Sequence, residues 1–139
     1  MKKANLLEND VFCKLIAIKS LKTAIVKAQQ FEIAALVRDK EKHLYEELYV
    51  IIFNEEEVIR RNKNWIFDLS LIQDVDKYFQ DNYQINLTIC NVVQSIKMKS
   101  YAIEMFCDLT KNYNTAEINQ QRKNMIAAIR ELKINSILA

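Results

Sequence analysis

Glycine and proline are both absent from this sequence of 139 residues. Glycine supplies the positive-φ positions of tight hairpin turns, and proline begins many other turns. A β-sheet protein of this size would be difficult to build without either residue, whereas helices need neither if asparagine can end them. The absence therefore predicts an all-α fold. Asparagine falls between the apolar runs, at Asn54, Asn62, Asn64, Asn82, Asn112 and Asn114.

The lack of glycine also excludes several kinds of chemistry. A P-loop, a dinucleotide-binding fingerprint and a nucleophile elbow all need glycines where the backbone approaches a phosphate or turns sharply. No enclosed pair of carboxylates provides a candidate for acid–base work either. We therefore expect a protein that is not an enzyme, with no catalytic residues, no cofactor and no bound metal.

Neither charge sign is in excess, and cysteine is scarce. The 20 basic and 18 acidic residues leave a net charge of +2, too weak to favour nucleic acid. The three cysteines, Cys13, Cys90 and Cys107, lie far apart within apolar stretches. This pattern predicts buried thiols in a reducing compartment.

No long hydrophobic run suggests export or a membrane span. Acidic and polar residues from Glu8 to Asp10 interrupt the start of the chain, unlike the apolar core of a signal peptide. The longest stretch without charge, residues 82–96, is short and contains several polar side chains. We therefore expect a cytoplasmic protein with no membrane partner.

What is present is helical periodicity within one predicted domain, residues 1–139. Asn9 and Asp10 predict the start of a first helix that runs to about Gln29, and a second helix is expected from Phe31 to about Phe53. The short polar connection between them predicts an antiparallel hairpin over residues 10–53.

The remaining residues, 54–139, predict the rest of a bundle of about five helices. One start is expected at residues 54–57, and a third apolar segment runs from Trp65 to near Asn82. A fourth runs from Ile85 to near Asn112. The pattern Asn-x-x-Glu from Asn114 predicts the start of a last helix, whose basic residues are expected to face solvent: Arg122, Lys123, Arg130 and Lys133.

One segment adds a family resemblance. Residues 21–48 read LKTAIVKAQQFEIAALVRDKEKHLYEEL, with a Phe-Glu-x-Ala-Ala-x-x-Arg-Asp core after a polar turn. This segment resembles the UVR motif, a short helical hairpin named after the bacterial excision-repair proteins UvrB and UvrC and also found in Clp-type ATPases and their regulators. The resemblance covers about a fifth of the chain. The family's zinc-binding cysteine pairs, nuclease domains and ATPase modules have no counterpart here.

The resemblance implies a bacterial adaptor whose hairpin docks on a like hairpin of a partner, such as a Clp-type ATPase or a repair or stress complex. Self-association is included in this expectation. Small alanines allow close helix packing, and Phe31 at the turn is expected to plug the end of the hairpin. The residues expected to bind the partner are Phe31, Glu32, Ala34, Ala35, Leu36, Arg38 and Asp39.

Two further side-chain groups have simpler explanations than a site. His43 could form a metal site with Asp39, Glu46 and Glu47 on one helix face. A di-iron bundle needs a second helix with such ligands, which the sequence lacks, so a salt-bridged surface is expected instead. The cluster from Arg60 to Lys63 with Trp65 could contact nucleic acid, although preceding glutamates would repel phosphate.

Two alternatives to the adaptor remain. In the first, the chain is a structural subunit or an antagonist of immunity type, and the hairpin is only part of its core. In the second, it is associated with nucleic acid. Exposure of Ala34, Ala35 or Leu36 distinguishes an interaction module from a purely structural bundle, which buries all of them within its own chain.

Overall fold

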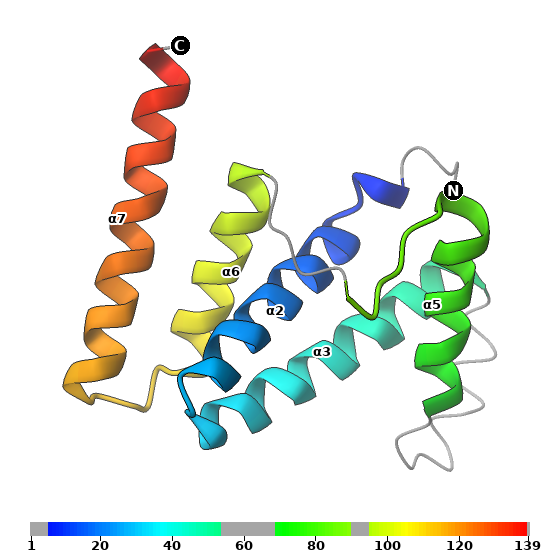
Figure 1. Ribbon diagram of the computed structural model, residues 1–139, viewed down its shortest axis with the longest axis horizontal. Helices are drawn as coiled ribbons and strands as arrows, with labels where there is room; N and C mark the ends of the chain where they lie inside the picture. The colour runs from blue at the N-terminus through cyan, green and yellow to red at the C-terminus, as the bar shows by residue number, and fades with distance from the viewer. Residues whose placement is uncertain (1–5, 54–68, 90–94, 139) are drawn as a thin grey trace.

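The computed structural model describes residues 6–53, 69–89 and 95–138. These ranges contain five helices and no strand, which confirms the all-α prediction (Figure 1). The helices are α2 (Asp10–Lys27), α3 (Phe31–Ile52), α5 (Leu69–Tyr83), α6 (Ile96–Leu109) and α7 (Ala116–Leu138). None of the helices in these ranges is long and apolar enough to cross a membrane. The helix start expected at residues 54–57 lies outside the described residues.

The predicted hairpin is present, and its ends are formed by local hydrogen bonds. Asn9 caps α2, because its Oδ1 accepts a hydrogen bond from the backbone N–H of Val11 at 2.8 Å. At the other end, Gln30 N–H donates to Ile25 O at 3.2 Å, and Gln29 N–H donates to Val26 O at 3.0 Å. This pair of bonds is a Schellman motif, which satisfies carbonyls that the helix leaves unpaired.

The left-handed positions are occupied by glutamine rather than by the expected asparagine. Within the described ranges, the residues with positive φ are Gln29, at 59°, and Gln84, at 55°. A residue with a Cβ pays about 1–2 kcal/mol in this region. Hydrogen bonds at each helix end offset that cost. At the end of α5, Gln84 N–H donates to the carbonyl of Gln80 at 3.1 Å.

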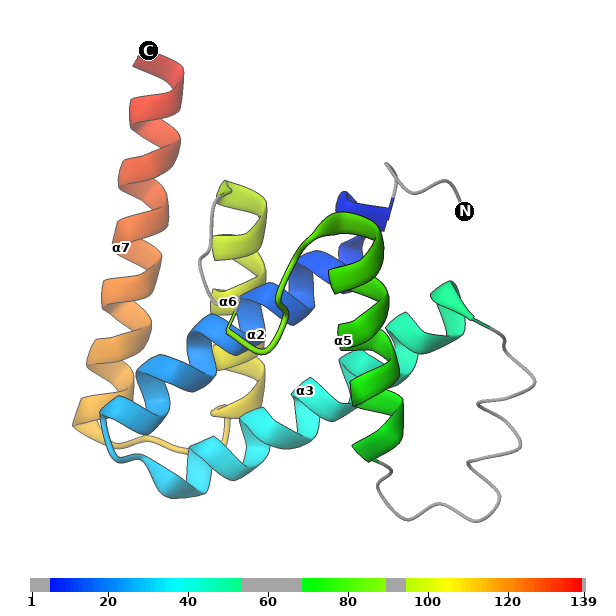
Figure 2. The same cartoon turned by 45° about the vertical axis from the view of Figure 1, so that its right-hand side comes forward.

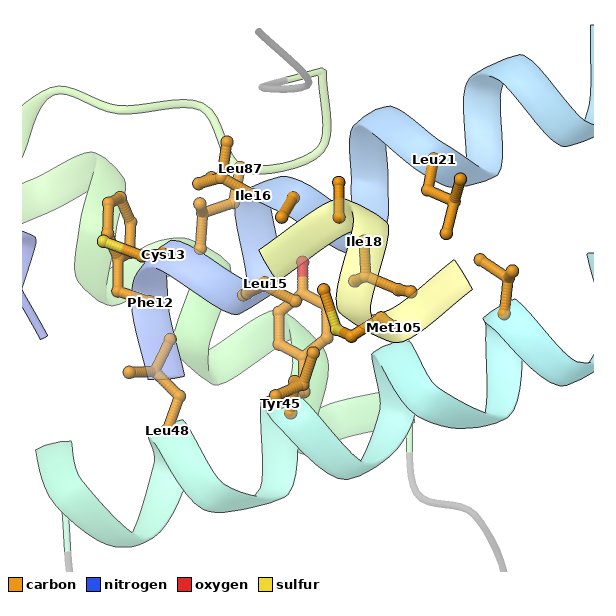
Figure 3. Packing of buried hydrophobic residues seen from close by; sticks show 14 of the residues in the cluster. Phe12, Cys13, Leu15, Ile16, Ile18, Leu21, Tyr45, Leu48, Leu87 and Met105 are labelled. Atoms are coloured by element: carbon orange, nitrogen blue, oxygen red, sulfur yellow. The ribbon is translucent and has the colours of Figure 1, made fainter. Parts of the chain in front are cut away.

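The hairpin is the centre of the fold. Both views place α5 against α3 and α6 against α2, and α7 stands beside α6 (Figures 1 and 2). Figure 3 shows Leu15 and Ile18 of α2 meeting Tyr45 of α3 and Met105 of α6. Leu87, from the connection after α5, reaches the same core and is fully buried.

The fourth apolar segment begins its helix later than expected. The prediction had it start near Ile85, but residues 84–89 are not helical and α6 begins at Ile96. Asn86 Oδ1 accepts a hydrogen bond from Thr88 N–H at 3.1 Å, an Asx turn that competes with helix formation. Ser95 then caps α6, since its Oγ accepts from Met98 N–H at 3.1 Å.

The last helix begins one residue later than its predicted cap implies. Thr115 Oγ1, and not the side chain of Asn114, accepts the hydrogen bond from Ile118 N–H at 3.2 Å. From there α7 runs 23 residues, about 35 Å at 1.5 Å per residue, whereas its neighbour α6 has 14 residues. The later turns of α7 therefore extend past α6 (Figure 1).

Candidate functional site

The first turns of α3 place most of the predicted docking residues on one exposed face. Phe31 is 69% exposed, and Ala35, Arg38 and Asp39 follow it at the i+4, i+7 and i+8 positions of the same helix side. Glu32 is exposed beside them, and Leu36, at the margin, is half-buried. We call these six residues the tip face.

The sequence had suggested that Phe31 plugs the end of the hairpin, and this expectation was wrong. Its ring faces solvent on the outer side of α3, opposite the residues that pack against α2. Val26, close to the end of α2, is also 40% exposed. An aromatic ring left in water forgoes a burial worth about 1.5–3 kcal/mol, and this apolar surface remains available for another molecule.

Ala34 belongs to the core and not to the tip face. Its side chain is 1% exposed and packs in the same cluster as Ile33 and Val37, on the side of α3 that faces α2. A partner cannot contact it in this structure. Adjacent alanines on a helix point about 100° apart, so one of them is buried while Ala35 remains on the surface.

The tip face carries one positive charge, Arg38, and two negative charges, Glu32 and Asp39. Arg38 and Asp39 are both exposed, and within the described residues neither forms a hydrogen bond or an ion pair. Opposite charges that are not paired with each other remain available to complementary charges on another surface. They can fix which way a partner helix lies across Phe31 and Ala35.

The single histidine lies in a solvated, salt-bridged surface. The side chain of His43 is 68% exposed, and its Nδ1 is 3.8 Å from Glu46 Oε2. Throughout the described ranges, no three His, Cys, Asp or Glu side chains come together in a group that could hold a metal ion. The arrangement fits the salt-bridged face expected from the sequence.

Cys13 provides no activated nucleophile. Cys13 is buried, and this burial raises the pKa of its thiol above the ordinary value, which keeps it protonated at neutral pH. Cys107 is half-buried, while Cys90 lies outside the described residues. The basic cluster of residues 60–63 and the nearby Trp65 lie outside them as well.

A buried polar cluster joins α2, α3 and α5, and sequence reasoning missed it. Lys19 Nζ is 3.3 Å from Glu41 Oε2, and Lys22 Nζ is 2.9 Å from Glu41 Oε1. The ammonium of Lys19 also lies 4.9 Å from the ring centroid of Tyr45. The hydroxyl of Tyr45 in turn donates a hydrogen bond to Asp76 Oδ1 at 2.8 Å.

The carboxyl of Asp76, a member of this cluster, has a shifted pKa. Burial raises the pKa of its carboxyl above the usual value, and the hydrogen bond from Tyr45 opposes that rise. The negative charge of Glu41 adds to the rise, and Lys19 opposes it. Each member of the cluster has a partner within the fold. The cluster therefore holds α5 against the hairpin and does not form a reactive site.

A second polar group holds the connection between α6 and α7. The guanidinium of Arg122 donates hydrogen bonds to the carbonyl of Thr110 and, at 3.0 Å, to the carbonyl of Tyr113. It also donates to Thr110 Oγ1 at 3.0 Å, and Thr110 is fully buried. The expectation that Arg122 faces solvent was wrong, because its guanidinium bonds carbonyls at the end of α6 that have no partner within the helix. The pattern of charges along the sequence does not reveal this need for donors.

Two further contacts attach outer elements to the hairpin. The amides of Gln30 and Gln121 exchange hydrogen bonds at 2.9 and 3.0 Å, which joins the hairpin turn to α7. Near the other end of α2, Lys97 Nζ is 2.6 Å from Asp10 Oδ1. The hydrogen bond from Lys97 lowers the pKa of Asp10, with a smaller contribution in the same direction from Tyr101.

Comparisons with known proteins do not identify the chain: no protein-family model, no curated protein and no solved structure matches it. The resemblance of residues 21–48 to the UVR motif therefore stays a prediction from those residues alone. The interpretation of the site depends on its own geometry, above all on the tip face.

Proposed function

We propose that this chain is a non-enzymatic adaptor of the bacterial cytoplasm, which docks on a partner protein through the tip face of its hairpin. The partner surface would be an apolar helix or helical hairpin, as in the Clp-type ATPases and repair or stress complexes that carry UVR motifs. The observation that carries the proposal is the 69% exposure of Phe31, one helical turn before the exposed Ala35.

Each part of the tip face has a distinct role in this proposal. Phe31 supplies most of the apolar area that a partner would bury, and aromatic residues dominate the energetics of protein interfaces. Ala35 allows the backbone of a second helix to approach closely. Arg38 and Asp39 select the partner's charge pattern and fix the register, since exposed charges contribute more to specificity than to affinity.

The test compares a charge introduced on the tip face with the same charge elsewhere. We expect Ala35→Glu and Phe31→Asp each to weaken partner binding at least tenfold, because a carboxylate would be buried without a counter-charge. The partner is first captured from native bacterial lysate by the unaltered chain and then purified. Its dissociation constant is measured for each variant, and the mass of the purified chain alone reports self-association.

Ala127→Glu provides a matched control, since Ala127 is also an exposed alanine on a long helix. Circular dichroism and thermal unfolding establish that all the variants keep the fold. If a folded Ala35→Glu chain retains the partner as tightly as the unaltered chain, the tip face is not the docking surface.

The structural alternative is favoured by one observation, the burial of Ala34 within the chain's own core. In that case the chain is a subunit or an antagonist whose hairpin serves only as a scaffold. Substitutions on the tip face would then leave every interaction unchanged, and a partner would be lost only through substitutions on another surface. The same set of variants therefore separates the two functions.

A further inference from the structure

A groove separates α7 from α2, with α6 at its base. It consists of two adjoining hollows, of about 350 Å³ and about 280 Å³, which share Ser20, Ala102 and Met125 in their walls. Among the described helices, α7 packs against α6 but not against α2. Figures 1 and 2 both show the start of α7 beside the end of α2 and its later turns diverging.

The groove is elongated and mostly apolar. One end lies at Lys99 in the first turn of α6, and the other lies at Phe106, two turns later. At 1.5 Å per residue these positions are about 10 Å apart along the helix. Beyond Phe106 the groove approaches the hairpin turn, where the amide pair of Gln30 and Gln121 joins α7 to the hairpin.

The charge that lines the groove has a single sign. Lys99 is the charged residue in the walls of the two hollows, and no carboxylate accompanies it there. Across the described part of the chain, Lys99 forms no ion pair. Its methylene stem can lie along the apolar wall while the ammonium stays hydrated at the end. An occupant with one negative group would complement this end.

We propose that the groove binds a free medium-chain fatty acid, with the carboxylate at Lys99 and the acyl chain directed toward Phe106. The size of the hollows is that of small-molecule sites, which are mostly apolar with few polar groups. Met125 is flexible enough to adjust to a narrow chain. This inference does not depend on docking at the tip face.

A second copy of the chain fits the groove less well. Its uncovered segment would be the later turns of α7, where Ile134 and Ile137 are exposed. That segment would bring Arg130 and Lys133 to a groove whose own charge is positive, with Glu131 as the single acidic residue between them. Like charges oppose such an insertion, whereas a carboxylate relieves the unpaired ammonium.

Isothermal titration calorimetry of the full chain with decanoate tests the proposal. We expect saturable binding at one site per chain, and weaker binding of decyltrimethylammonium, which carries the opposite charge. Lys99→Met should weaken decanoate binding about fivefold, the upper range for a partly exposed ion pair, and leave decanol binding unchanged. From hexanoate to decanoate, affinity should rise by up to about fourfold per methylene.

Two neighbouring alanines of α7 provide a matched pair that reports on the location. Ala128 lines the groove and Ala127 does not, while both are exposed. Ala128→Trp should abolish decanoate binding, and Ala127→Trp should leave it intact. Absence of saturable binding, or equal effects of the two variants, would overturn the proposal. A fall in the mass of the purified protein on Ala128→Trp alone would assign the groove to a second copy instead.

Discussion

The helices α3 and α7 are almost equal in length, at 22 and 23 residues, yet they occupy opposite positions in the structure. The first is packed between α2 and α5 and also touches α6, whereas the second packs against α6 alone among the described helices. The buried side chains of α3 extend from Ile33 to Tyr49. In α7, the described side chains that reach burial are Ile118 and Ile129.

The difference teaches that the arrangement of apolar residues matters more than their number. The buried positions of α3 recur on one side of the helix, so a single stripe meets α2 and α5. In α7, Ile126, Ile134 and Ile137 are exposed and lie away from the stripe of Ile118 and Ile129. α3 is therefore part of the core, and α7 is an arm attached through its first four turns.

The largest expected effect comes from truncating one buried side chain in each helix. Leu48→Ala in α3 removes a fully buried side chain, and we expect the free energy of unfolding to fall by about 3–4 kcal/mol. Ile129→Ala in α7 removes a side chain that is 8% exposed beside an open groove, and about 2 kcal/mol or less should be lost. Urea unfolding followed by circular dichroism measures both losses.

Equal losses in the two helices would break the comparison, because they would mean that α7 is as firmly integrated as α3. Ile134→Ala serves as the control for helix composition, since Ile134 is 56% exposed and should change stability little.

An intermediate effect is expected at the attachment of the arm. Arg122→Met removes the donors that serve the carbonyls of Thr110 and Tyr113, and about 1–2 kcal/mol should be lost with those hydrogen bonds. The readout specific to the comparison is hydrogen–deuterium exchange, which should accelerate in α7 and stay unchanged in α3. Lys123→Met, an exposed neighbour, should have no such effect.

The smallest effect concerns Asp76 of α5, whose carboxyl is partly buried against α3. The raised pKa of Asp76 means that the folded chain holds this proton at pH values where the unfolded chain, near pKa 3.9, has released it. The carboxyl therefore lowers the free energy of unfolding as pH rises from about 4 toward its folded pKa. Asp76→Asn removes this decrease, and its advantage over the unaltered chain should grow with pH.

Urea unfolding at several pH values between 4 and 7 measures this dependence, with Asp81→Asn as the control at an exposed carboxylate of the same helix. The contribution of Asp10 to the pH dependence of stability has the opposite sign. Its lowered pKa stabilises the fold above the unfolded pKa, and this stability is lost as pH falls. A difference between Asp76→Asn and the unaltered chain that stays constant across this range would show that Asp76 is not shielded by α3.

Local signals in the sequence were sufficient for the fold class and for the hairpin. The absence of glycine and proline predicted the fold class, and Asn9 predicted the start of α2 because a cap bonds residues only two or three positions away. The segment after Gln84 was misread as helical, since Ile85 and Ile89 have the i, i+4 spacing of an apolar helical stripe. There the Asx turn of Asn86 decided the structure.

The remaining features depend on contacts that no local pattern reveals. Lys19 and Glu41 interrupt the apolar stripes of two different helices, and only the packing of the hairpin shows that they neutralise each other. Helical spacing placed Ala34 on the apolar stripe with Val37 and Leu44, whereas the resemblance to the UVR motif assigned it to the docking surface; the structure buries it. The groove beside Lys99 depends on how far α7 diverges from α2, and the sequence contains no measure of that divergence.

The mode of attachment of α7 has a consequence for the order in which the molecule comes apart. A helix held mainly at its first turns can fray from its far end at low cost, while the hairpin requires the loss of its whole core to open. Gentle heating or dilute denaturant should therefore erase the wall that α7 gives to the groove before it disturbs Phe31. The chain would lose its capacity for a small ligand while it could still present an intact surface to another protein.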